Sequence, residues 1–204
     1  TLAASVDGWL SYRNASPLTI GLVGSLSGIS TTGQDVQLTS AGLTINESIV
    51  VGAGDLALIS SGPVTQRAAI SGNGLLLQGS GPFELTQSDN EFTSLAGSTT
   101  GTVAYTDQSA LTIGTVDALG RTLSGLWTTG QDVQLTSAGL TINESIVVGA
   151  GDLALISSGP VTQTAAISGS GLLLQGSGPF ELESADNDFQ VLAGDTRGSV
   201  AYRD

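Results

Sequence analysis

The stretch TTGQDVQLTSAGLTINESIVVGAGDLALISSGPVTQ occurs twice in this 204-residue chain, beginning at Thr31 and again at Thr128. The correspondence continues to Leu85 and Leu182 with only two substitutions between the copies. An enzyme needs its reactive groups once, whereas stacked coils need the same backbone height and interior volume many times. The duplication, at a spacing of 97 residues, therefore predicts a repeat architecture.

A seven-residue marker sets the boundaries of the repeats. It reads GWLSYRN at position 8, GTVAYTD at 101 and GSVAYRD at 198. We expect one continuous β-solenoid over residues 1–204, with units at about 8–100 and 101–197 and the start of a third at 198–204. The second copy carries four additional residues between Gly114 and Gly125, so the segment TVDALGRTLSG is predicted to be a protruding turn.

Strand-like runs recur inside each unit at a shorter spacing. They are DVQLTS at 35, DLALIS at 55, GLLLQG at 74, TVAYTD at 102 and DVQLTS again at 132, which predicts about four coils per unit and about eight in the chain. Alternation places one set of side chains inside, namely Val36, Leu38, Leu56, Leu58, Leu75, Leu77, Val103 and Tyr105. It places the other set outside, namely Gln37, Ala57, Leu76 and Ala104.

The fold class follows from these runs together with what is missing between them. Gly or Pro interrupts every candidate helix, and Gly, Asn, Ser and Asp separate the short runs as turn residues do. A single coil cannot bury its own apolar face, but stacked coils bury a continuous one. The sequence therefore predicts an all-β parallel β-helix, or β-solenoid, in which neighbouring repeats are each other's main partners.

Composition excludes several classes of function. The formal net charge is -13 and the only basic side chains are five arginines, so there is no cationic surface for nucleic acid or for an anionic membrane. No apolar run is long enough for a membrane helix, and no membrane insertion is expected. The absence of Cys excludes a disulfide framework, and the absence of Met indicates a part of a longer protein.

The sequence of the repeats resembles that of a known family. TTGQDVQLTSAGLTINESI, GAGDLALISSGPVTQ, GLLLQGSGPFEL, SLAGSTTGTVAYTD and VLAGDTRGSVAYRD look like the repeat region of filamentous-haemagglutinin-like exoproteins, the large adhesins of Gram-negative bacteria. The resemblance implies a right-handed β-helix, export by a partner transporter in the outer membrane (two-partner secretion), and extracellular display at the cell surface. It implies a stalk that mediates adhesion or biofilm contact; the alternative is the stalk of a contact-dependent growth inhibition protein that delivers a toxin.

A third reading is a β-helix that binds or degrades polysaccharide. The carboxylate clusters that could serve as acid and base are Asp89 with Glu91 and Asp186 with Asp188. Asp and Asn beside Ser and Gly are ordinary turn residues, and the chain has no His or Lys to assist catalysis, so no enzymatic activity is expected. The same four carboxylates are weak calcium candidates, and no cofactor is expected because they form no ladder from coil to coil.

Two aromatic residues are candidates for ligand contact. Trp9 and Trp127 could stack on sugar rings if exposed, or could plug a coil near a unit boundary. Cell-surface glycans or proteins are the partners that this would serve. The unpaired edges at the two ends of the rod also predict end-to-end self-association.

Overall fold

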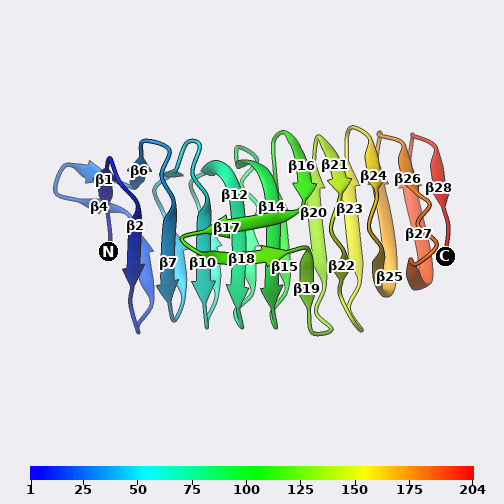
Figure 1. Ribbon diagram of the computed structural model, residues 1–204, viewed down its shortest axis with the longest axis horizontal. Coiled ribbons are helices and arrows are strands. Elements are labelled where there is room, and N and C mark those ends of the chain that lie inside the picture. Colours follow the sequence, from blue (N-terminus) through cyan, green and yellow to red (C-terminus); the bar gives the residue numbers. More distant parts are fainter.

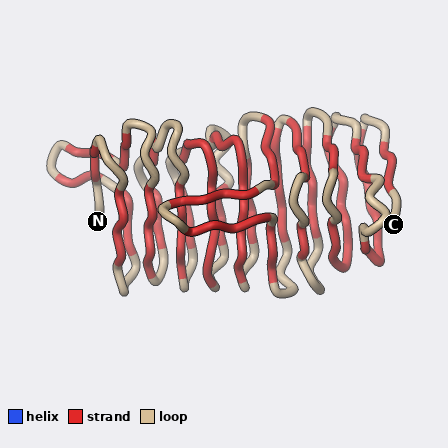
Figure 2. Tube along the Cα trace, viewed as in Figure 1, coloured by secondary structure: helices blue, strands red, loops and turns tan.

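The structure is a computed structural model that describes residues 1–204, and it is an elongated rod of short strands and turns without any helix (Figures 1 and 2). Successive turns of the chain stack along the long axis, and neighbouring turns pair through parallel strands. The only antiparallel pairs are two hairpins that leave the rod between turns. No helical segment exists that could span a membrane. The predicted all-β parallel β-solenoid is confirmed.

The strands form three ladders, here called faces 1, 2 and 3 in the order in which the chain visits them. Face 1 contains β1 (Ala4–Val6), β6 (Ile29–Thr31), β9 (Ile49–Val50), the starts of β12 (Ile70–Gly79) and β14 (Glu91–Thr99), β16 (Ala110–Ile113), β21 (Gly139–Ile142), β24 (Val161–Gln163), β26 (Phe180–Leu182) and β28 (Val200–Tyr202). Face 2 contains β2 (Leu10–Arg13), β7 (Val36–Ser40), β10 (Leu56–Ser60), the ends of β12 and β14, β19 (Leu126–Thr128), β22 (Ile146–Val147), and the starts of β25 (Ile167–Gly176) and β27 (Asp188–Thr196). Face 3 contains β3 (Leu18–Ile20), β8 (Leu43–Ile45), β11 (Val64–Gln66), β13 (Phe83–Leu85), β15 (Val103–Thr106), β20 (Val133–Ser137), β23 (Leu153–Ser157) and the ends of β25 and β27.

The rod has nine turns, which can be counted on face 3. The paired residues on successive levels are Leu18, Leu43, Val64, Phe83, Val103, Val133, Leu153, Leu172 and Leu192. Val36 lies on the second level of face 2, whereas its counterpart Val133 lies on the sixth level of face 3. One 97-residue unit therefore advances by four turns and one further face, or four and a third turns.

This count corrects the expectation of four coils per unit and eight in the chain. The expected alignment placed Val103 above Leu75, but Leu75 pairs with Leu95 and Val103 pairs with Phe83 on the next face. The end of β14, with the sequence LAGST, forms the overlooked level of face 2. Its Gly97 and short side chains do not read as a strand in sequence, because strand patterns are recognised from β-branched and aromatic residues.

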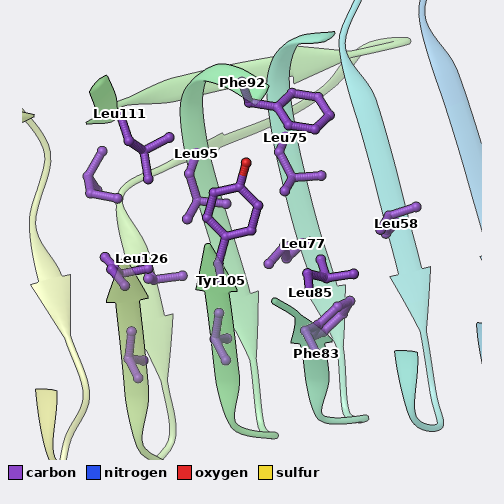
Figure 3. Close-up of a cluster of buried hydrophobic side chains, with 14 of the residues drawn as sticks. Leu58, Leu75, Leu77, Phe83, Leu85, Phe92, Leu95, Tyr105, Leu111 and Leu126 are labelled. Carbon is purple, nitrogen blue, oxygen red and sulfur yellow. The ribbon is translucent and has the colours of Figure 1, made fainter. Parts of the chain in front are cut away.

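The interior is a continuous column of apolar side chains. A single cluster of 39 buried residues runs through the rod, and the side chains predicted to point inward all belong to it. Figure 3 shows its central part, where Phe83, Phe92 and Tyr105 fill the space between the leucines of adjacent turns. No buried side-chain nitrogen or oxygen lacks a hydrogen-bond partner. The five main pockets lie outside this column and open on the surface.

The two hairpins occupy equivalent places in the two units but behave differently. The shorter one, β4 (Leu22–Val23) with β5 (Leu26–Ser27), projects past the N-terminal end of the rod (Figure 1). The longer one, β17 (Thr115–Ala118) with β18 (Arg121–Ser124), lies across the strands along the rod axis (Figure 1). The segment predicted to protrude as a turn is thus a hairpin that folds back and covers part of face 2.

Candidate functional site

The four acidic candidates lie in solvent at the turns that lead into β14 and β27. Asp89, Glu91, Asp186 and Asp188 are all exposed. Glu91 accepts a hydrogen bond from the Gln108 side chain at 2.8 Å. No three acidic side chains of the chain lie close enough to hold a metal ion together.

The residue between each acidic pair has a role that the sequence reading missed. Asn90 is fully buried, and its amide nitrogen donates to the Gln66 side chain and to the carbonyls of Leu85 and Thr106 at 2.8 to 3.1 Å. Its oxygen accepts from the Gln66 side chain and from the Ile70 amide at 2.8 and 3.0 Å. One side chain therefore ties three successive levels together.

Asn187 repeats this arrangement in the second unit. It exchanges hydrogen bonds with Gln163 and accepts from the Ile167 amide at 3.0 Å. A sequence signal for this role exists. The pattern Asp-Asn-acidic-Phe is the same in both copies, whereas the residues directly before it differ. The acidic side chains on either side are exposed, whereas the amide between them is buried and structural.

The Tyr and Asp of the boundary marker form a second buried polar contact. The Tyr105 hydroxyl donates to the Asp107 carboxylate at 2.6 Å, and the Phe92 amide donates to the same oxygen at 2.8 Å. The other oxygen accepts from the amide and the hydroxyl of Ser109. Burial, followed by the charge of Asp107 and the hydrogen bond to it, raises the pKa of Tyr105 far above the ordinary value for tyrosine. In the last turn, burial and the Asp204 contact raise the pKa of Tyr202 to about 12.

These tyrosines predict a loss of stability at alkaline pH. Above pH ~10 tyrosine ionises in the unfolded chain, while Tyr105 stays protonated in the folded chain, so the unfolded state is favoured as the pH rises. The contribution of Tyr105 to the free energy of unfolding is fully present below pH ~10, and it falls by about 1.4 kcal/mol by pH 11. Urea unfolding at pH 8, 9, 10 and 11 should show that the free energy of unfolding declines less with pH for Tyr105→Phe than for the wild type. Equal declines would contradict this assignment.

The largest surface feature is a groove that each unit repeats. In the second unit it has a volume of about 660 Å³ and follows the corner between faces 3 and 1. In the first unit it has a volume of about 500 Å³ and follows the corner between faces 2 and 3. Both linings are rich in hydroxyl groups. The second-unit groove also contains Arg197, and the first-unit groove contains Arg13. The hydroxyl-bearing positions that both grooves share are Thr39, Ser40, Ser60, Ser61 and Ser80, which recur as Thr136, Ser137, Ser157, Ser158 and Ser177.

Trp127 lies at the end of the first-unit groove. Its pocket, about 360 Å³ in volume, shares Gly79 and Thr100 with that groove and is otherwise lined by Gln, Ser and Thr. The residue is 48 % exposed, and its indole nitrogen donates to the Ser124 carbonyl at 3.2 Å, which fixes one edge of the ring. Hydroxyl groups beside a fixed aromatic ring are the chemistry that suits a sugar chain.

Trp9 does not join this site. The residue is 64 % exposed and precedes the first level of face 2, whereas Trp127 lies on the sixth level. Five turns separate the two, or about 24 Å at ~4.8 Å per turn. Neither ring fills the interior of a coil.

Comparison with known proteins agrees with the internal period. Residues 33–99 and 130–194 each match a family described as "Repeats of unknown function (DUF5649)", and the two matches begin one 97-residue period apart. No curated protein and no solved structure matches the chain. Since the two matches span more than half of its residues, the chain belongs to this family of repeats.

Proposed function

We propose that this chain is a rigid segment of a large exoprotein at the surface of a Gram-negative bacterium, and that its hydroxyl-lined grooves hold polysaccharide during adhesion or biofilm contact. The observation that carries the proposal is the repetition of an open polar groove along an unbroken apolar rod. The resemblance to filamentous-haemagglutinin-like repeats supports the location at the cell surface.

The mechanical part of the proposal follows from the stacking. Each unit of four and a third turns would lengthen the rod by about 21 Å at ~4.8 Å per turn. Because the parallel ladders and the interior column continue across the unit boundary at β15 and β20, no hinge separates the units. Duplicating a unit would extend the reach of the rod without redesigning an interface.

The adhesive part follows from the groove beside Trp127. An extended sugar chain would lie along the corner of the rod, with its hydroxyl groups facing Thr and Ser and one ring against the indole. Open grooves with few apolar residues bind weakly one at a time, but a rod that repeats them gains from multiple attachment. Adhesion by many weak contacts is consistent with this surface.

The test is binding of the full chain, immobilised on beads, to a panel of bacterial cells, host cells and purified polysaccharides. We expect saturable binding to at least one polysaccharide, and Trp127→Ala should weaken it by about tenfold or more, as loss of a central aromatic contact does. The matched control is Trp9→Ala, which removes an exposed tryptophan outside the groove and should bind as the wild type does.

Two outcomes would contradict the adhesive part. Absence of saturable binding to every member of the panel would leave the rod as a spacer only. Equal weakening by Trp9→Ala and Trp127→Ala would indicate non-specific aromatic contact rather than a groove. Circular dichroism of both variants would establish that the fold is unchanged.

A further inference from the structure

The longer hairpin closes over a small apolar patch on face 2 of the first unit. Val116 and Ala118 of β17 pack on Ala57, Leu76 and Ala96, and all five side chains are at most 1 % exposed. The three rod residues point outward from three successive levels, as the alternation predicted for Ala57 and Leu76. They are buried only because the hairpin covers them.

Polar contacts and a glycine fix the position of the hairpin. At its tip the Leu119 amide donates to the second carboxylate oxygen of Asp35 at 3.1 Å, and Arg121 donates to the Gln78 side chain. Near its base, a Cβ atom on Gly74 would come within 2.8 Å of the Val116 side chain. The receiving surface of the first unit therefore consists of three apolar residues, two polar acceptors and one glycine.

The second unit carries the same receiving surface on face 3, and nothing covers it. Its apolar residues Ala154 and Leu173 are half-buried and Ala193 is exposed, in contrast to their fully buried counterparts. A groove of about 350 Å³ runs beside them and is lined by Asp132, Ala154 and Leu173 among others.

The polar acceptors of this surface are also present and unused. Asp132 accepts the Asp152 amide through one oxygen, as Asp35 accepts the Asp55 amide, but its second oxygen accepts no hydrogen bond. Gln175, the counterpart of Gln78, forms no side-chain hydrogen bond in the chain. Gly171 is the counterpart of Gly74. A Cβ atom on Gly171 would contact only Asp152, so the space that corresponds to the Val116 side chain is open.

We propose that the surface formed by Ala154, Leu173, Ala193, Asp132 and Gln175 is a docking site for a hairpin of the β17–β18 type, donated by a further repeat of the same family. The occupant is chosen because the same side chains already receive this hairpin one period earlier in the chain. The β4–β5 hairpin of a second copy fits less well, since its loop is four residues shorter and presents Leu22, Val23 and Leu26 instead of Val116 and Ala118. Each repeat then holds the repeat before it, and the docking surface meets the second-unit groove at Gln175.

The test extends the full chain after Asp204 by a second copy of residues 108–147, which continues the period because Asp204 corresponds to Asp107. Hydrogen exchange would be measured at the added hairpin, with the built-in β17–β18 hairpin of the same molecule as the internal standard. We expect comparable protection of both. Leu173→Asp should speed exchange at the added hairpin by at least about tenfold, since a buried side chain of this size contributes that much or more, and should leave β17–β18 unchanged.

Two matched variants complete the design. Leu76→Asp should release β17–β18 and spare the added hairpin, and Val147→Asp, an outward substitution on face 2 of the second unit, should release neither. An added hairpin that exchanges freely while the added copy of β19 is protected would overturn the proposal. So would insensitivity of the added hairpin to Leu173→Asp.

A second measurement applies if the added turn does not fold. The unextended chain would be titrated with a peptide of residues 114–125 that carries an added cysteine at each end, oxidised to a disulfide, and the Leu173 methyl signals would be followed by NMR. Shifts confined to Leu173 and its neighbours would support docking, and no shift at millimolar peptide would overturn it. Burial of Leu173 that requires only a higher concentration of the chain itself would assign the surface to a second copy instead.

Discussion

Replacing Gly81 with alanine is expected to lower the free energy of unfolding by about 3 kcal/mol or more. A Cβ atom on Gly81 would lie 1.8 Å from the carbonyl oxygen of Gly62 in the turn below. Neither backbone can move away, because Val64 donates to the Pro82 carbonyl and Phe83 donates to the Thr102 carbonyl on either side of the corner. The methyl group would have to separate two turns.

The measurement is urea unfolding of Gly81→Ala beside Gly8→Ala. No atom lies within 4 Å of a Cβ on Gly8, so this control should change stability by less than about 0.5 kcal/mol. Equal midpoints for the two variants would mean that the corner is not packed as tightly as the structure has it. Gly178→Ala tests the same contact in the second unit, where the Cβ would lie 1.6 Å from the Gly159 carbonyl oxygen.

Asn90→Ala is expected to lower the free energy of unfolding by about 3 to 5 kcal/mol. Alanine would take the Asn90 oxygen away from the Ile70 amide, and would remove one hydrogen-bond partner each from the Gln66 side chain and from the Leu85 and Thr106 carbonyls. Each buried group that loses its hydrogen bond costs about 1 to 3 kcal/mol, partly offset where water enters. Since the amide spans several levels, we also expect protease cleavage at the neighbouring turns.

Two companion variants identify the cause. Asp89→Ala removes an exposed carboxylate next to Asn90 and should be nearly neutral. Asn187→Ala removes the equivalent amide near the last turn, where local fraying reduces the cooperative loss, so its effect should be smaller than that of Asn90→Ala. Near-neutrality of Asn90→Ala itself would show that the network contributes little to stability.

The sequence predicted the fold class because its two strongest signals are geometrically simple. A long exact repeat requires stacked units, and the alternation in segments such as VQLTS separates inward from outward side chains, so Val36, Leu38, Leu56 and Leu58 were placed correctly. The count of turns was wrong because LAGST pairs as a strand through its backbone while its side chains give no strand pattern. Backbone pairing imposed by neighbouring turns overrides local propensity there.

The surface was harder to predict than the interior. The grooves arise from hydroxyl groups that are far apart in sequence and meet only when turns are stacked, so no local motif marks them. The burial of Ala57 and Leu76 depends on a hairpin from a later part of the chain. Exposure of Trp127 could not be derived from the sequence either, because its place on face 2 follows from the extra third of a turn.

Because of that extra third of a turn, a rod of many units distributes equivalent grooves over all three of its edges. Each unit presents its groove at an azimuth one corner away from the last, so equivalent sites return to the same side only after three units, or 13 turns and about 62 Å at ~4.8 Å per turn. A rod of whole turns per unit would instead carry all its sites along one edge. With the fractional turn, a filament lying on a surface in any rotational orientation would have about one third of its grooves facing that surface, and the other two thirds would face away from it.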